Sequence, residues 1–281
     1  AASINDLVLE RAELPIPEVP TEKNMHQIRA AEKLIRRKRR EYEMQNRQFP
    51  EMEEDDRLKE YLDRCAFINK DGETCEFTTL QKHDLNLVLQ KRYALLNWQQ
   101  GSGKTAAVYH RAKYLLKFRK TKNVIILAPA IATNMTWIPF LTINKERFRT
   151  IQTAGDLDNV PEGTFLVVST SMLRKLKRGL MRFVKRTSGK LCLVFDESDE
   201  ITNPTSQRTR NILCIFRRLK YKILDTGTTT RNNIAELYSQ FELLYNNSVN
   251  MICWSPQVYH ENRDHEIEEE NNPDYGTPFP A

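Results

Sequence analysis

The sequence predicts an α/β fold, in which a mostly parallel sheet is flanked by helices and is preceded by a mainly helical accessory region. After residue 80, short apolar runs alternate with longer helix-like stretches. The apolar runs lie too far apart to form hairpins, so consecutive strands must be joined through the helices. The run at 124–128 contains no polar residue, which is typical of a strand that is covered on both faces.

The first part of the chain, residues 1–64, is expected to be an arm followed by a helical accessory region. Three prolines close the first 20 residues, which show no sustained period. From Thr21 to about Gln48, apolar residues recur at helical spacing after a plausible N-cap. The basic run at 36–40 is more typical of a solvated helical face than of a phosphate site. A second short helix is predicted over 57–64.

A hairpin is predicted next, over residues 65–79. Asp71-Gly72 is a strong turn signal, and short runs with apolar, aromatic and threonine residues stand on either side of it. Cys65 and Cys75 flank the turn and, with His83, offer three zinc ligands. Paired Cys-x-x-Cys spacing is absent, so this metal site is disfavoured.

Residues 65–258 are expected to form the main α/β domain, and residues 259–281 an acidic tail. Strands are predicted at 93–98, 123–130, 164–171, 190–196 and 221–227, and helices at 80–91, 105–120, 171–186 and 208–219.

Charge is distributed unevenly along the chain. The whole sequence has a net charge of +6, but residues 81–258 carry 28 basic and 12 acidic side chains, a net charge of +16. Such an excess favours contact with a polyanion, most commonly nucleic acid. A merely soluble basic surface is the alternative.

Composition excludes several classes of protein. No apolar run approaches the roughly 18 residues that cross a bilayer, and no basic-then-apolar leader is present. The five cysteines are odd in number and scattered, which suits free thiols in a reducing compartment. We therefore expect an intracellular protein, cytoplasmic or associated with a nucleoid or nucleus, without a membrane partner.

The most informative motif follows the first predicted strand of the domain. Glycines let a backbone wrap a phosphate, and the helix N-terminus that follows adds positive potential. Lys104 would reach the β- and γ-phosphates of ATP, and Thr105 would bind Mg²⁺. Trp98 occupies the first position of the strict motif, where glycine is usual. The predicted nucleotide-binding residues are Gln100, Gly101, Ser102, Gly103, Lys104 and Thr105.

A second motif is an acidic pair at the end of the strand 190–196. Ligands of open α/β sheets bind at the carboxyl ends of the strands. Asp196 is expected to hold Mg²⁺ through water, and Glu197 to polarise the water that attacks the γ-phosphate. Lys104, Asp196 and Glu197 are thus the catalytic candidates.

The next strand ends in Thr226, Gly227 and Thr228. Their small side chains can sense the nucleotide and link it to movement, although a simple turn is an alternative.

Four blocks in this order resemble the first motor lobe of the Swi/Snf-like branch of the superfamily 2 translocases. They are QQGSGKT, the segment with Pro129 and Trp137, the segment from Asp196 to Ser206 with Asn203-Pro204, and the segment with Asn232-Asn233 and Glu236-Leu237-Tyr238. The resemblance covers about residues 80–245. It implies a RecA-like P-loop lobe of a DNA-dependent ATPase.

The chain departs from the family pattern at several positions. Asp199 stands where the family usually has histidine, so the coupling between nucleotide and DNA is expected to differ. Thr229 replaces a proline. Asp84 stands where the family has the glutamine that reads adenine, and Gln81, one helical turn earlier, is a weak substitute candidate.

The resemblance also implies a second lobe, which contributes arginines to ATP hydrolysis. About 36 residues follow Tyr245, too few for such a lobe. We therefore expect a fragment of a longer motor that hydrolyses ATP poorly by itself.

For DNA, the resemblance implies sequence-independent contacts with the duplex backbone at two strand ends. The candidates are Pro129, Ser169 and Ser171, with Arg174 and Lys175 nearby. Hydroxyl groups and helix N-terminal amides suit phosphate contacts. The acidic stretch 261–270 either covers this basic surface or forms a linker.

Two other functions remain open at the level of sequence. A P-loop ATPase of another class would lack the Asn203-Pro204 segment. A catalytically weak or dead nucleic-acid-binding scaffold would explain the departures at Asp84 and Asp199, whereas the intact Lys104 argues against it.

Overall fold

A computed structural model describes residues 52–187, 189–227 and 237–245, together with single helical positions between 25 and 39. The chain divides into two compact units, Ala1–Pro50 and Glu51–Ala281. The helix predicted from Thr21 is confirmed at the described positions, and the rest of it lies outside them. The predicted domain boundaries at 64 and 258 stay predictions.

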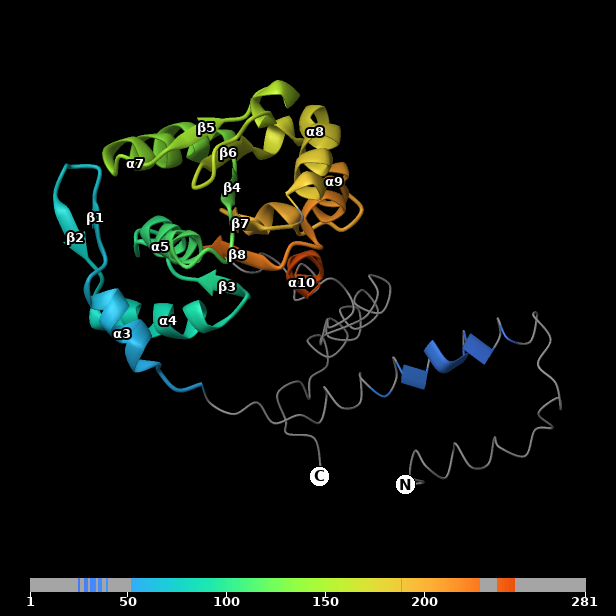
Figure 1. Ribbon diagram of the computed structural model, residues 1–281, viewed down its shortest axis with the longest axis horizontal. Helices are drawn as coiled ribbons and strands as arrows, with labels where there is room; N and C mark the ends of the chain where they lie inside the picture. Colours follow the sequence, from blue (N-terminus) through green and yellow to red (C-terminus); the bar gives the residue numbers. More distant parts are fainter. Residues whose placement is uncertain are drawn as a thin grey trace, which may run out of the picture. The chain divides into compact units, whose positions relative to one another are not determined.

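The second unit is built on a parallel sheet with the strand order β3-β8-β7-β4-β6-β5 (Figure 1). This confirms the predicted α/β fold. Five of the six strands fall on predicted runs. The strands are β3 (Tyr93–Asn97), β4 (Asn123–Ala128), β5 (Phe148–Thr150), β6 (Phe165–Ser169), β7 (Leu191–Phe195) and β8 (Tyr221–Thr226).

Helices cover both faces of this sheet, as expected for parallel strands. The helices and helical turns of the unit are α3 (Asp56–Asp63), α4 (Thr79–Gln90), α5 (Lys104–Lys117), α6 (Ala130–Ala132), η2 (Thr133–Trp137), α7 (Ile138–Ile143), η3 (Ala154–Leu157), η4 (Thr170–Met172), α8 (Leu173–Arg186), η5 (Ser198–Ile201), α9 (Gln207–Phe216) and α10 (Leu237–Tyr245). The helices predicted at 80–91, 105–120, 171–186 and 208–219 are confirmed within a few residues at each end.

Alternate residues of each strand enter two separate cores. Val194 and Ile223 face the core that α3, α4, α5 and α7 cover. Their neighbours Phe195 and Leu224 face the core that α8, α9 and α10 cover. Because side chains alternate between the faces of a strand, each strand residue belongs to one of these two cores.

The predicted hairpin is confirmed as β1 (Ala66–Ile68) paired antiparallel to β2 (Thr74–Glu76). It is attached to the end of α7 by Asn144, whose side chain accepts from the Ile68 amide at 2.8 Å and donates to the Ile68 carbonyl at 2.9 Å. The hairpin and α3 therefore belong to the same compact unit as the sheet.

The hypothetical zinc ligands have other partners. Cys65 Sγ donates to the Tyr61 carbonyl at 3.3 Å, and His83 Nδ1 lies 2.8 Å from Glu54 Oε1. The four described cysteines are free thiols, and Cys253 lies outside the described residues. Among the helices of the described part, none is long and apolar enough to cross a bilayer.

Candidate nucleotide site

The loop between β3 and α5, here called the phosphate loop (residues 99–103), has the backbone that a phosphate cradle requires. Gly101 and Gly103 have φ values of 78° and 83°, in the left-handed region that glycine enters without steric cost. Gly103 is the N-cap of α5, and no side chain caps the helix. The first amide groups of α5 are therefore left to a ligand, and an anion is favoured by the helix dipole.

The Lys104 ammonium lies folded over this loop. Its Nζ donates to the Trp98 carbonyl at 3.1 Å and to the Gln99 carbonyl at 3.3 Å. Ser102 Oγ donates to the same Gln99 carbonyl at 2.6 Å. These bonds hold the loop closed around the lysine, and a phosphate would compete with the two carbonyls for the ammonium.

Strand β8 lies between β3 and β7, so its carboxyl end enters the site between the phosphate loop and the acidic pair. A Cβ atom on Gly227 would lie 3.2 Å from Gln100 Cγ and 3.6 Å from Lys104 Nζ. Glycine thus permits the close approach of strand end and loop. Thr226 is buried, and Thr228 lies outside the described residues.

The acidic pair lies at the end of β7, as predicted. Asp196 is 8% exposed, and its Oδ2 accepts a hydrogen bond of 2.7 Å from Trp137 Nε1. Trp137, which belongs to the second block of the family resemblance, lies in η2. It is fully buried, and its hydrogen bond also orients the Asp196 carboxylate. Local sequence patterns do not predict this role, because Trp137 and Asp196 lie far apart in the chain.

Glu197 has a strained backbone and a perturbed carboxyl group. Its φ of 53° lies in the left-handed region, which costs about 1 kcal/mol or more for a residue with a side chain and occurs often at functional sites. Burial raises the pKa of Glu197, and the charges of Asp196 and Asp199 raise it further, while Lys104 opposes the shift. A carboxyl group whose pKa moves toward neutral pH suits general base chemistry.

Asp199 lies in η5, directly after the acidic pair, and is 4% exposed. The neighbouring Ser198 donates from Oγ to Gln240 Oε1 of α10 at 3.0 Å. The turn that carries Asp199 is thereby joined to α10. Its predicted role in coupling stays a prediction.

One acidic residue of the site was missed at the level of sequence. Asp225, in β8, is fully buried, and its carboxyl group lies against that of Asp196 and the backbone of Glu197. Burial raises the pKa of Asp225 well above its ordinary value, and the negative charge of Asp196 adds to this, while Lys104 opposes it. The alternation along β8 places Ile223 and Asp225 on one face, and this pattern could have predicted that Asp225 is buried.

Comparison with known proteins agrees with this geometry. The ATP-dependent helicase FUN30 of Saccharomyces cerevisiae is 27% identical over 175 residues, which are 58% of this chain and 15% of the helicase. No family model matches the chain.

Two solved structures share the fold. The SWI2/SNF2 ATPase core of Sulfolobus solfataricus in complex with double-stranded DNA superposes with a TM-score of 0.53 at 16% identity, covering 70% of this chain and 41% of the other. The core domain without DNA gives 0.50 at 17% identity, with coverages of 68% and 38%. The Swi/Snf-like resemblance is confirmed. The chain thus spans less than half of each of these relatives.

Gln81, the candidate adenine reader, and Asp84, which stands at the family's glutamine position, both have partners within the chain. Gln81 Nε2 donates to the Ser102 carbonyl at 2.8 Å, and Gln81 Oε1 accepts from the Thr78 amide at 2.8 Å. Asp84 Oδ2 accepts from Trp98 Nε1 at 2.8 Å. Gln81 thus lies at the phosphate loop, as a nucleotide-site residue should, but adenine contact by it stays a prediction.

The DNA candidates of this chain gather at neighbouring strand ends. Ala128 at the end of β4 pairs with Ser169 at the end of β6. Pro129, which follows Ala128, therefore lies beside Ser169 at the carboxyl edge of the sheet. Ser169 Oγ and Ser171 Oγ lie 2.8 Å apart. Arg174 and Lys175 are exposed in the first turn of α8. DNA contact by these five residues is not tested by this arrangement and stays a prediction.

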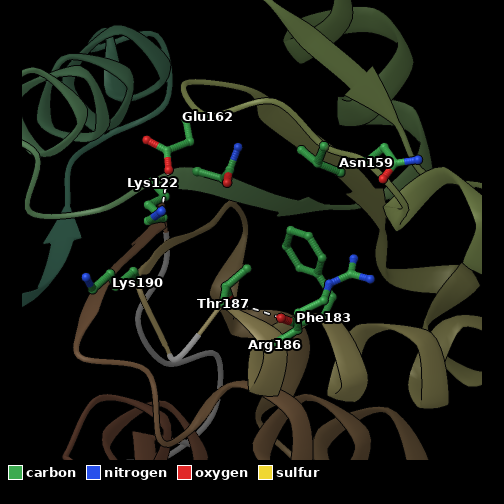
Figure 2. A pocket seen from close by; sticks show the side chains of 9 residues that line it. Lys122, Asn159, Glu162, Phe183, Arg186, Thr187 and Lys190 are labelled. Carbon is green, nitrogen blue, oxygen red and sulfur yellow. Dashed lines mark hydrogen bonds and ion pairs between the residues drawn. The ribbon is translucent and has the colours of Figure 1, made fainter.

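A cavity of about 500 Å³ lies at the opposite edge of the same sheet (Figure 2). Two of its three cations have partners: Lys122 pairs with Glu162, and Arg186 donates to the Leu157 carbonyl at 2.6 Å. Lys122 and Lys190 directly precede β4 and β7, so the cavity lies at the amino ends of the strands. Ligands of open α/β sheets bind at the carboxyl ends, so we do not place the nucleotide there.

The donor set at the carboxyl edge fits a divalent cation of the Mg²⁺ type. Carboxylate and hydroxyl oxygens are the ligands such ions prefer, and Asp196 and Thr105 supply one of each at this edge. In the described part of the chain, no group of three or more acidic, histidine or cysteine side chains is arranged to hold a metal by itself. The nucleotide phosphates and water would have to complete the coordination.

Proposed function

We propose that this chain is the ATP-binding first lobe of a DNA-dependent ATPase that couples hydrolysis to movement along duplex DNA. One observation carries the proposal: β8 brings its Gly227 against Lys104 on one side, while β7 places Asp196 and Glu197 on the other. A phosphate-binding loop and an acidic pair thereby face one site at the carboxyl edge of a RecA-like sheet.

Each residue has a distinct role in the proposed reaction. Lys104 exchanges the loop carbonyls for the β- and γ-phosphates, and the free amide groups at the start of α5 hold the same anion. Thr105 and Asp196 would hold Mg²⁺, which neutralises phosphate charge during transfer. Glu197 accepts a proton from the attacking water. Trp137 holds Asp196 in place through its Nε1 hydrogen.

The same edge of the sheet continues into the proposed DNA surface. In the order of the strands, the phosphate loop follows β3, Gly227 follows β8 and the acidic pair follows β7. Pro129 and Ser169 come next, at the ends of β4 and β6. Nucleotide and phosphate backbone would therefore bind side by side. We propose Asp199 and Thr226–Thr228 as the coupling residues between them.

We further propose that a second lobe completes the hydrolytic site, and that the protein works inside the cell, where ATP and DNA both occur. A positively charged residue from that lobe would stabilise the transferring phosphoryl group, a contribution worth about 10³–10⁵ in rate in related reactions. The 281-residue chain should then bind ATP and hydrolyse it slowly.

The test separates binding from turnover. Binding of a fluorescent ATP analogue to the chain should be lost in Lys104→Ala and kept in Lys122→Ala, the matched lysine at the opposite edge of the sheet. ATP turnover by the full-length protein should rise severalfold with duplex DNA and vanish in Lys104→Ala. If turnover is absent with every nucleic acid while binding depends on Lys104, the lobe is a binding scaffold.

A second test concerns DNA. Non-specific affinity for duplex DNA should fall linearly with the logarithm of salt concentration, and Arg174→Ala with Lys175→Ala should lower that slope by about one or two phosphate contacts. Arg186→Ala, on the same helix but bonded to the Leu157 carbonyl, is the control. An unchanged slope in the double variant would remove α8 from the DNA surface.

A further inference from the structure

Trp98, which stands at the glycine position of the strict phosphate-loop motif, is held in place by its side chain. The indole is partly buried and packs against the core that α4 and α5 cover. Leu96, two residues earlier, is buried in the same core, so the alternation of β3 continues through Trp98. The indole Nε1 donates to Asp84 Oδ2 of α4 at 2.8 Å. The polar end of a buried indole needs such a partner.

The two partners in this bond are both departures from the expected sequence patterns. Asp84 replaces the glutamine of the family pattern, and Trp98 replaces the glycine of the strict loop motif. They lie 14 positions apart in the sequence, where nothing relates one to the other. In the fold they share one hydrogen bond to a carboxylate, which is stronger than a bond between neutral groups. The two departures therefore form a single structural feature.

The backbone of Trp98 has a different partner. Its carbonyl accepts from Lys104 Nζ at 3.1 Å, so the residue that the indole anchors also holds the ammonium. The same helix holds the other end of the loop, because Gln81 Nε2 donates to the Ser102 carbonyl at 2.8 Å. Gln81 and Asp84 are three positions apart and share one face of α4. Helix α4 thus fixes the phosphate loop at its start and near its end.

We propose that Asp84 and Trp98 are a positioning pair that sets the affinity of the phosphate loop for the phosphates of a nucleotide. A loop that is ordered before binding loses less conformational entropy when the ligand arrives, and therefore binds it more tightly. The pair acts through the loop backbone and through Lys104, without contact with the base. This inference rests on the proposed function for the kind of ligand, and it assigns to Asp84 a role in phosphate affinity.

The experiment measures displacement of a fluorescent ATP analogue from the 281-residue chain by unlabelled ATP and by pyrophosphate, which carries phosphates and no base. Trp98→Phe and Asp84→Ala should each weaken the binding of both ligands about 3- to 10-fold. The double variant should bind no more weakly than either single variant, because all three lose the same hydrogen bond. Asp84→Asn, which keeps an acceptor oxygen, should bind within about twofold of the wild type.

Asp63→Ala is the matched control. Its carboxylate also accepts a bond of 2.8 Å from a side chain, but the donor is Lys82, and the bond joins α4 to α3 instead of to the loop. This variant should bind both ligands as the wild type does. Urea unfolding without nucleotide identifies a variant that does not fold. Because Trp98→Phe and Asp84→Ala remove opposite partners of the bond, either one alone suffices for the comparison of the two ligands.

The outcomes separate phosphate positioning from other roles of the pair. Weaker ATP binding with unchanged pyrophosphate binding would make the pair a base contact and overturn the inference, as would additive losses in the double variant. Tighter pyrophosphate binding would also overturn it, because the pair would then hold Lys104 away from the phosphates. Binding that depends on Lys104 but not on the pair overturns this inference alone, whereas no binding by the wild type overturns the proposed function as well.

Discussion

Strand β8 buries a charged residue near each end, and the two are treated in opposite ways. Near the amino end, the Lys222 ammonium donates to the Arg217 carbonyl at 2.8 Å and to the Leu243 carbonyl at 2.6 Å. Toward the carboxyl end, Asp225 lies against a second carboxyl group, that of Asp196. Both side chains are almost fully buried, so burial alone does not explain the difference.

The same contrast extends along the two edges of the sheet. At the amino edge, charged groups are paired internally, as Lys122 is with Glu162 and Arg186 with a backbone carbonyl. At the carboxyl edge, carboxyl groups crowd one another, and Glu197 has a strained backbone. The amino edge thus pairs opposite charges, and the carboxyl edge gathers carboxyl groups of like charge.

The largest effect should come from Glu197→Gln in the full-length protein. Loss of the base should lower ATP turnover by about 10²–10⁴, while affinity for an ATP analogue should stay within about threefold because the amide keeps the shape. Steady-state kinetics beside equilibrium binding would measure both. Turnover within tenfold of the wild type would assign the base to another residue.

A pH-dependent prediction tests the amino end of β8. Burial lowers the pKa of Lys222 from 10.5 to about 8, so between those values the unfolded chain holds a proton that the folded chain has released. The free energy of unfolding therefore rises with pH through this window, by about 2 kcal/mol between pH 8 and pH 10 from this group alone.

Urea unfolding of the wild type and of Lys222→Met at both pH values would isolate this contribution, because other groups that titrate at alkaline pH are common to the two proteins. The difference in free energy of unfolding between wild type and variant should shift by about 2 kcal/mol in favour of the wild type as pH rises. A constant difference would mean that Lys222 stays protonated in the fold.

A smaller loss is expected from Trp137→Phe at the carboxyl edge. The change removes the hydrogen bond to Asp196 Oδ2 and some packing, and it should cost about 1–3 kcal/mol of stability. Urea unfolding at neutral pH would measure it. If Mn²⁺ restores most of the loss, the unpaired Asp196 oxygen has been taken up by the cation, and if Mn²⁺ restores none, Trp137 acts only through packing.

The smallest effect should come from Lys122→Ala at the amino edge. Its exposed ion pair with Glu162 contributes less than about 1 kcal/mol, so the urea midpoint should barely move and ATP-analogue binding should not change. Weakened nucleotide binding in this variant would contradict the assignment of separate roles to the two edges.

Most of the fold follows from local patterns. The apolar runs of β4, β6 and β7 are long and free of charge, and the glycines of the phosphate loop stand between a strand and a helix, so each was predictable alone. β5 was missed because Phe148–Thr150 is only three residues long and carries an arginine, which leaves no run to recognise.

The site was predictable only where its residues are adjacent in sequence. Lys104 follows the loop glycines, and Asp196 and Glu197 are neighbours. The bond from Trp137 to Asp196 joins residues 59 positions apart, and the burial of Asp225 depends on which face of β8 it occupies and on what covers that face. Both facts arise from packing, which local patterns do not contain. The residues Asn232, Asn233 and Glu236, the acidic stretch 261–270 and the tail 259–281 lie outside the described residues.

The side chain of Gln81 forms hydrogen bonds in two places, the capping box of α4 and the phosphate loop. Its oxygen completes the capping box that begins α4, and its nitrogen holds the phosphate loop at Ser102. A loop that opens to admit phosphate must either carry the first turn of α4 with it or give up a bond worth about 1 kcal/mol. Nucleotide binding to the loop is therefore expected to perturb the first turn of α4, the helix that packs on α3. Amide hydrogen exchange in that turn would detect nucleotide binding without any label in the site.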